Sequence, residues 1–211
     1  YGVQWFPTTG RELAAQKWTA AVSEKAGKAI TCINAGTYGS DFADGELRVS
    51  LVRGPAYSAL PINDRPLVRQ DRYSPRIDQG ERLFKFWFNA GSRKERLERI
   101  DREALAHNER PFALSFYPSG AGTAPEPTVT LSDNVIQLTA LKKAQDNEDY
   151  ILRLFEPTGE RRRTTLKIHA IGLERDVDLG AFEIKTLRLN AVAKTLKEVD
   201  LLERDLQKDD K

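Results

Sequence analysis

The feature of this sequence that most limits its fold is a succession of short β-branched and aromatic runs separated by turn residues. Such runs are typical of β-strands, because branched and aromatic side chains pack well on a pleated surface. One run is Lys28–Asn34, and two others, Tyr38–Phe42 and Glu46–Val52, flank Asp44-Gly45. The Asp-Gly pair tolerates the positive φ angles of a type I′ turn, so these two runs predict a β-hairpin.

The same pattern continues through most of the chain. Arg82–Phe88 contains five large apolar residues and predicts a central strand with both faces largely covered. Further strands are predicted at Pro111–Tyr117, Thr128–Leu131, Val135–Leu141, Tyr150–Glu156, Arg163–Ala170 and Ala181–Leu189. Together these elements predict a mostly β protein, folded as a large antiparallel β-sandwich (supersandwich-like) with one or two surface helices.

Helical patterns occur in a few places. Ser92 and Glu95 fit a capping box, and the apolar residues that follow share one helical face, which predicts a surface helix over residues 93–107. Gln4–Ser23 is ambiguous, with Ala-rich helical potential. Val192–Lys211 fits either a short amphipathic helix or a frayed end.

Length and composition restrict the class of protein. The 211 residues fit one large domain or a main domain with a small appendage, and the net charge of +2 does not indicate binding to nucleic acid or to an anionic membrane. No apolar run approaches the roughly 18–20 residues of a membrane span. The single Cys excludes a disulfide framework and a Cys-based zinc cluster. Residues 119–127 form a flexible connector that predicts sub-lobes at 1–118 and 128–211. Because the chain has no Met, we expect it to be a piece of a longer protein.

Few residues have the spacing of a catalytic or metal site. His107 and His169 lack partners at metal-binding spacing, and Cys32 lies in an apolar strand, so we interpret all three as structural. The basic run at residues 161–163 follows a turn and is interpreted as a solvated hairpin tip. An anion or partner site at this run is the alternative.

The long stretch from Gly54 to Gln79 contains four prolines and exceeds the length of an ordinary connection, which is typical of functional loops. With its flanks it mixes planar donors, acceptors and aromatic rings, as carbohydrate sites do. The candidate substrate-binding residues are Tyr38, Arg53, Arg76, Asp78, Gln79 and Gly80. A structural tie between this loop and the following strand is the alternative role for Arg76 and Asp78.

At these residues the sequence resembles the C-terminal β-rich region of glycoside hydrolase family 38, the α-mannosidases, in its bacterial branch. The resembling pieces occur in the family's order and cover most of the chain: Gln16–Trp18, Ile33–Asp41, Gly45–Tyr57, Pro75–Phe88, Tyr150–Glu160 and Glu183–Leu189. Many relatives read Asp-x-Gly-x-His where this chain has Asp78 to Arg82. No role of that His is therefore transferred to Arg82.

The resemblance implies a parent protein that is a retaining, metal-dependent α-mannosidase acting on terminal α-D-mannose. Its Asp nucleophile and its zinc or other divalent metal would belong to a catalytic domain expected before Tyr1, so no catalytic residue, metal ligand or cofactor is assigned to this chain. The implied partners are that catalytic domain and mannose-containing glycans, with neither nucleic acid nor membrane, and the implied location is the bacterial cytoplasm. An independent carbohydrate-binding module and a complete small enzyme of another class are the alternatives. Alone, the chain is expected to be inactive.

Overall fold

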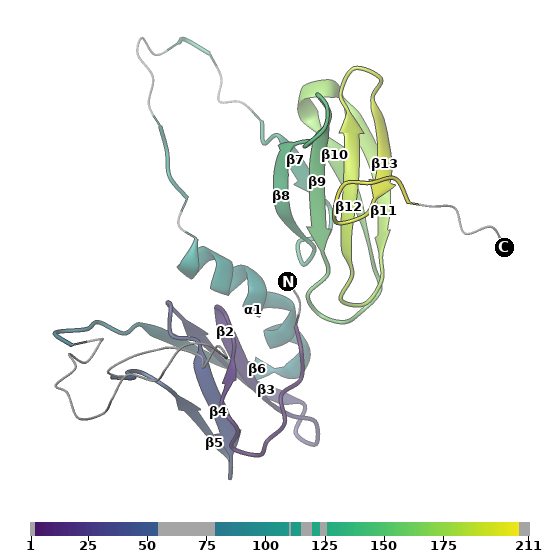
Figure 1. Ribbon diagram of the computed structural model, residues 1–211. Helices are drawn as coiled ribbons and strands as arrows, with labels where there is room; N and C mark the ends of the chain where they lie inside the picture. Colours follow the sequence, from purple (N-terminus) through teal and green to yellow (C-terminus); the bar gives the residue numbers. More distant parts are fainter. Residues whose placement is uncertain (1–2, 55–78, 110, 115–119, 123–125, 207–211) are drawn as a thin grey trace, which may run out of the picture.

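The structure, a computed structural model, describes residues 3–54, 79–109, 111–114, 120–122 and 126–206 (Figure 1). These residues form thirteen strands in four antiparallel sheets, together with one α-helix and a short 3₁₀ turn. The predicted mostly β fold, consistent with a β-sandwich, is therefore confirmed. No helix in the described ranges has the length and apolarity needed to cross a membrane.

Two three-stranded sheets form the N-terminal part of the chain, residues 3–109, in the orders β1-β4-β5 and β2-β3-β6. Their strands are β1 (Leu13–Ala14), β2 (Trp18–Ser23), β3 (Lys28–Asn34), β4 (Gly39–Ala43), β5 (Glu46–Val49) and β6 (Phe86–Ser92). The hairpin predicted between β4 and β5 is present, and Asp44 and Gly45 have φ angles of 52° and 79°. These positive values fit the type I′ turn that the Asp-Gly pair predicts.

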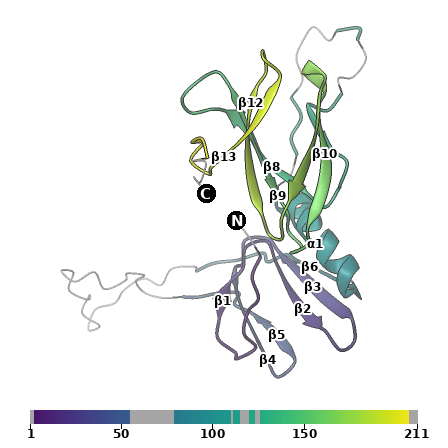
Figure 2. The ribbon, with the colours of Figure 1, turned by 90° about the vertical axis from the view of Figure 1, so that its right-hand side faces the viewer.

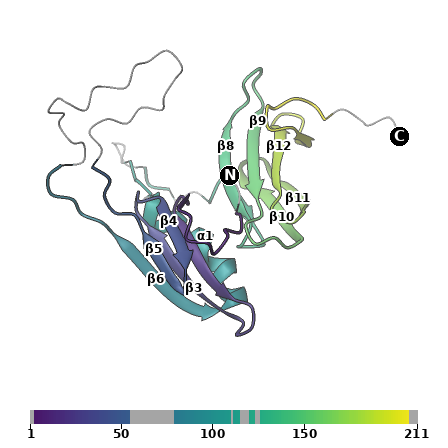
Figure 3. The ribbon, with the colours of Figure 1, turned by 60° about the horizontal axis from the view of Figure 1, so that its bottom comes forward.

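The helix α1 (Arg93–Asn108) follows β6 directly and confirms the predicted surface helix. It begins after Ser92, whose side chain accepts a hydrogen bond from the Glu95 amide and so satisfies one of the free N–H groups of the first turn. Ile100 and Ala104 pack against Ile33 of β3 and are fully buried. Figure 3 shows α1 between the β2-β3-β6 sheet and the sheets of the C-terminal part.

The C-terminal part, residues 126–206, contains the orders β11-β10-β7 and β13-β12-β9-β8. The elements are β7 (Val129–Leu131), β8 (Gln137–Lys143), β9 (Tyr150–Phe155), β10 (Arg162–Ile168), the 3₁₀ turn η1 (His169–Ile171), β11 (Leu173–Leu179), β12 (Ile184–Asn190) and β13 (Thr195–Val199). Figure 2 shows these two sheets facing each other, with β12 in one and β10 in the other.

Between these two sheets lies the main hydrophobic core, to which both contribute inward-pointing residues. Its buried members are Ile136, Leu152, Leu154, Leu166, Ile168, Leu173, Val177, Leu179, Leu187 and Leu189. Burying each such side chain contributes about 1.5–3 kcal/mol, so this core holds the two sheets together. The period-2 burial of β10, in which Thr164, Leu166 and Ile168 point inward, is typical of a strand with one covered face.

Several local predictions were wrong. Arg82–Phe88 is not a central strand: β6 starts at Phe86, lies at a sheet edge and leaves Phe88 exposed. Gln4–Ser23, which the sequence left ambiguous, contains β1 and β2 and no helix, because pairing of β2 with β3 outweighs the helical propensity of its alanines. The described part of Val192–Lys211 contains the strand β13, which pairs with β12, and no helix.

Two predictions are only partly covered by the described residues. The described residues of Pro111–Tyr117, 111–114, form no strand, and the others lie outside the described ranges. The division into sub-lobes at 1–118 and 128–211 stays a prediction.

Candidate functional site

A groove of about 500 Å³ lies where β1, the start of β4 and the residues after β5 meet. Its walls include Glu12, Tyr38, Ser50, Arg53 and Phe84. Backbone hydrogen bonds fix its floor, since the Ala15 amide donates to the Tyr38 carbonyl at 2.8 Å and the Ser50 amide donates to the Gly39 carbonyl at 2.9 Å. The groove is thus built on sheet backbone, although its side chains come from strand ends and connections.

The carboxylate of Glu12 organises the polar side of this groove. It accepts hydrogen bonds from Arg53 Nη2 at 3.1 Å and from the Ser50 hydroxyl. Gly39 lies against it: a Cβ at this position would come within 2.5 Å of Glu12 Oε1 and 3.1 Å of Ser50 Cβ. A side chain at residue 39 would therefore displace the Glu12 carboxylate from its partners.

Arg53 is largely exposed, and an exposed ion pair contributes only about 0–1 kcal/mol to stability. The Glu12–Arg53 pair therefore orients two polar groups more than it stabilises the fold. A guanidinium, a carboxylate, a hydroxyl and the exposed ring of Tyr38 surround one hollow. This set can donate to and accept from neighbouring hydroxyl groups while the ring covers an apolar patch, which suits a polyhydroxylated ligand.

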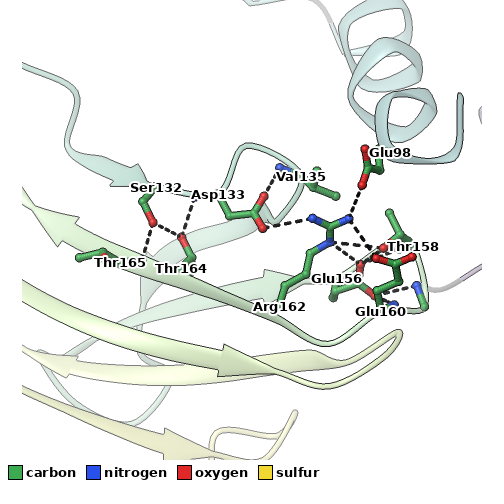
Figure 4. A network of polar contacts seen from close by, with 11 residues as sticks. Glu98, Ser132, Asp133, Val135, Glu156, Thr158, Glu160, Arg162, Thr164 and Thr165 are labelled. Carbon is green, nitrogen blue, oxygen red and sulfur yellow. Dashed lines mark hydrogen bonds and ion pairs between the residues drawn. The ribbon is translucent and has the colours of Figure 1, made fainter. Parts of the chain in front are cut away.

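A second polar cluster joins α1 to the C-terminal part and is centred on Arg162 (Figure 4). The Arg162 side chain is only 13% exposed and contacts Glu98 at 3.0 Å, Asp133 at 3.3 Å and Glu156 at 3.3 Å. The interpretation of residues 161–163 as a solvated hairpin tip is therefore wrong for Arg162. It fits Arg163, which is exposed and pairs with Asp176 at 2.8 Å.

Glu156 is fully buried at the end of β9 and orders the turn that follows. Its carboxylate accepts hydrogen bonds from the amides of Thr158 and Gly159 at 2.8 Å and of Phe182 at 3.0 Å. Burial alone would raise the pKa of Glu156, but these hydrogen bonds and that of the Thr158 hydroxyl outweigh it and hold the pKa below its ordinary value. The cluster is therefore built as a charged structural tie.

Asp101 lies on the same helix as Glu98 and shows the opposite effect. Burial raises its pKa from an ordinary 3.8 to about 6, and the hydrogen bond that Trp18 Nε1 donates to Oδ1 at 3.0 Å offsets this only in part. The other oxygen, Oδ2, is buried without a hydrogen-bond partner among the described residues.

Comparison with known proteins identifies the C-terminal part. Residues 135–210, which contain β8 to β13, match the family model described as "Glycosyl hydrolases family 38 C-terminal beta sandwich domain". This segment is similar to a family 38 C-terminal β-sandwich domain. It includes all ten buried members of the main core and the Arg162–Glu156 pair, and the family resemblance inferred from the sequence is confirmed.

Solved structures extend the likeness in fold beyond the matched family 38 segment. An alpha-mannosidase from Enterococcus faecalis V583 has a TM-score of 0.64 and 20% identity over 86% of this chain, which spans 22% of that protein. A glycosyl hydrolase family 38 protein from Enterococcus faecalis has a TM-score of 0.66 and 19% identity, with 86% of this chain and 23% of that one covered. No curated protein matches the sequence. At these identities the likeness establishes the fold.

All the predicted site residues lie outside the segment that matches the family 38 model, and only some of them line the groove. Tyr38 and Arg53 line the same groove. Gln79 and Gly80 are described but are not among the groove's lining residues, and the φ angle of 102° at Gly80 is one that favours glycine. Arg76 and Asp78 lie outside the described residues.

Sequence reasoning missed Glu12 and Ser50. Ser50 lies in the same resembling segment as Arg53, so its position three residues earlier was a usable signal. Glu12 lies in the ambiguous stretch before β2, and no sequence signal marked it as a site residue. Arg82, which received no role, also lines the groove.

The residues interpreted as structural lie in structural settings. His107 lies in the last turn of α1 and its ring stacks on Trp87 at 4.1 Å, while His169 Nε2 lies 2.9 Å from the Thr130 hydroxyl. Burial raises the pKa of the Cys32 thiol, which makes it less reactive. Within the described ranges no three His, Cys, Asp or Glu residues gather as a metal site, so the zinc-type ion that family 38 implies has no fitting ligand set among them.

Proposed function

We propose that this chain is the non-catalytic C-terminal region of an α-mannosidase that hydrolyses terminal α-D-mannose residues. The carrying observation is the family 38 match over residues 135–210, supported by a fold shared with the Enterococcus faecalis alpha-mannosidase over 86% of this chain. In this proposal the catalytic domain, with its nucleophile and its zinc or other divalent ion, belongs to the remainder of the polypeptide. The enzyme works in the bacterial cytoplasm on mannose-containing glycans.

The chain has two roles in this proposal. The first is to support the catalytic domain, for which a packed sandwich is a rigid base. The second is to line the sugar cleft with the groove of Glu12, Tyr38, Ser50 and Arg53, which offers both hydroxyl-binding groups and an aromatic face. Arg76, Asp78, Gln79 and Gly80 are proposed to contribute polar contacts at the same rim.

An assay of two proteins tests the first role. The complete polypeptide and the 211-residue chain are each incubated with an aryl α-mannoside and with zinc or another divalent ion. We expect turnover on the order of 1–10³ per second from the complete polypeptide and none above background from the chain alone. Turnover by the chain alone, or an inactive complete polypeptide, contradicts the proposal.

The exposed ring of Tyr38 beside the groove favours one alternative, an independent carbohydrate-binding module. Calorimetric titration of the 211-residue chain with mannose and short α-mannosides separates the two proposals. A module binds these sugars by itself and loses binding in Tyr38→Ala. A cleft-lining region needs the catalytic domain to complete the site, so the chain alone gives no measurable heat.

A further inference from the structure

The β2-β3-β6 sheet differs from the other sheets in the chemistry of its edges. Unpaired strand edges invite further pairing, and proteins usually protect them with charged residues or by keeping the edge strand short. Six of the eight edge strands are protected in these ways: β5, β8, β11 and β13 carry charges such as Arg48, Lys142, Asp176 and Lys197, while β1 and β7 have two and three residues.

The two remaining edge strands, β2 and β6, have neither protection. Trp18–Ser23 and Phe86–Ser92 are six and seven residues long and contain no charged side chain. Among the described residues each of these strands pairs with β3 alone. Both edges of this sheet therefore lack the features that usually prevent an edge strand from pairing with another segment.

Part of one face of the same sheet is also apolar and open. Ile30 and Phe88 are 54% and 67% exposed, although both lie within strands. Ile30 pairs with Ala90 and Cys32 pairs with Phe88, so all four residues lie on one face. Cys32 is buried there, whereas Ile30, Phe88 and Ala90 are exposed. The other face is the one that α1 covers, where Ile33 packs against Ile100. We call Ile30, Phe88 and Ala90 the open face.

The N-terminal part also buries little apolar surface for its size. Among its described residues the buried apolar ones are Ala29, Cys32, Ile33, Ile100 and Ala104, and none comes from β1, β4 or β5. The smaller C-terminal part has a cluster of ten. A unit with so small a core gains much of its stability from surface that it buries against another unit.

We infer that the open face and the uncharged edge of β6 form the surface on which the remainder of the polypeptide, including the catalytic domain, docks. This inference rests on the proposed function. The length of the structural relatives favours this occupant over a second copy of the chain: this fold accounts for 22% of the Enterococcus faecalis alpha-mannosidase, so more than three quarters of such a polypeptide lies outside it. The partner surface is apolar opposite Ile30 and Phe88, and an extended segment of it pairs with β6.

Photo-crosslinking in the complete polypeptide tests the inference. Benzoylphenylalanine replaces Phe88 in one sample and Val192, which is 96% exposed on the C-terminal part, in a control. After irradiation and digestion, peptide mass mapping identifies the partner segment. We expect position 88 to crosslink within the same polypeptide to a segment preceding this chain, and position 192 to give no such product. A crosslink from position 88 to a second copy, or none, overturns the inference.

A stability comparison gives an independent result. The double substitution Ile30→Thr and Phe88→Thr is made in the complete polypeptide and in the 211-residue chain, with Val192→Thr as the matched control. We expect Tm to fall by several degrees in the complete polypeptide alone, because only there do the two side chains leave water. Equal shifts in both proteins overturn the docking surface.

The hydrolysis assay separates this inference from the proposed function. If the polypeptide crosslinks as expected but does not cleave an aryl α-mannoside, the docking surface is supported and the proposed function is contradicted. If the polypeptide is active but position 88 does not crosslink, the docking surface is contradicted and the proposed function is supported.

Discussion

Arg162 of β10 lies 3.0 Å from Glu98 of α1, so one guanidinium joins the C-terminal sandwich, which matches the family 38 model, to the helix of the N-terminal part. The same side chain neutralises Asp133 and the fully buried Glu156. Three carboxylates from three segments therefore depend on a single cation that is itself nearly buried.

Arg162→Ala should lower the free energy of unfolding by about 3–5 kcal/mol, because it leaves the buried Glu156 without its cation. Urea unfolding followed by circular dichroism measures this change. The control is Arg163→Ala, which removes an exposed arginine from the next position and should change stability by about 0.5 kcal/mol or less. Equal effects of the two substitutions would show that the cluster is not a structural tie.

Gly159→Ala should destabilise the turn that Glu156 orders. Gly159 has a φ angle of 81°, and a Cβ there would come within 2.6 Å of the Phe182 ring, so the substitution adds a clash to backbone strain. We expect a loss of about 1–3 kcal/mol in thermal or urea unfolding. Gly172→Ala is the matched control, because its φ angle of 60° is also positive but its Cβ would meet no atom within 4 Å. If the control loses as much stability, the ring contact has no role.

The raised pKa of Asp101 predicts a specific pH dependence. Its folded pKa of about 6 exceeds its ordinary value of 3.8, so the folded state binds a proton more tightly than the unfolded state does. The contribution of Asp101 to stability therefore rises as the pH falls from about 7 to about 4, by up to about 3 kcal/mol. Asp101→Asn keeps an acceptor for Trp18 Nε1 and removes the charge.

The measurement is the difference in unfolding free energy between Asp101→Asn and the wild type, taken at pH 7, 6 and 5. We expect the variant to be more stable at pH 7 and this advantage to shrink as the pH falls. Taking the difference cancels the other carboxylates, such as Glu156, whose lowered pKa makes them lose stability at lower pH. A difference that does not change with pH contradicts the assignment.

Local sequence signals predicted the elements that depend on local chemistry. The Asp44-Gly45 turn and the Ser92 cap were predicted because each needs particular residues within four positions. The strand β2 could not be predicted in this way, since its alanines favour a helix and only pairing with β3 makes it a strand. The edge position of β6 could not be predicted either, because it also depends on which strands pair in the fold.

The candidate site was predictable in the same limited way. Tyr38 and Arg53 lie in segments that resemble a known family, and the structure brings them to one groove. Glu12 reaches that groove through the pairing of β1 with β4, and the sequence around Glu12 does not specify that pairing. Arg162 looked like one of three surface arginines, because two of its carboxylate partners are distant in sequence: Asp133 is 29 and Glu98 is 64 positions away.

The most direct test of the proposed role is the kcat/KM of the complete polypeptide for an aryl α-mannoside, compared between the wild type and Arg53→Ala, with Arg163→Ala as the control. If the groove lines the sugar cleft, Arg53→Ala lowers kcat/KM roughly tenfold, equivalent to about 1.4 kcal/mol of lost binding, while Tm stays unchanged because the Glu12–Arg53 pair is exposed. A kcat/KM equal to that of the wild type and of Arg163→Ala contradicts the account.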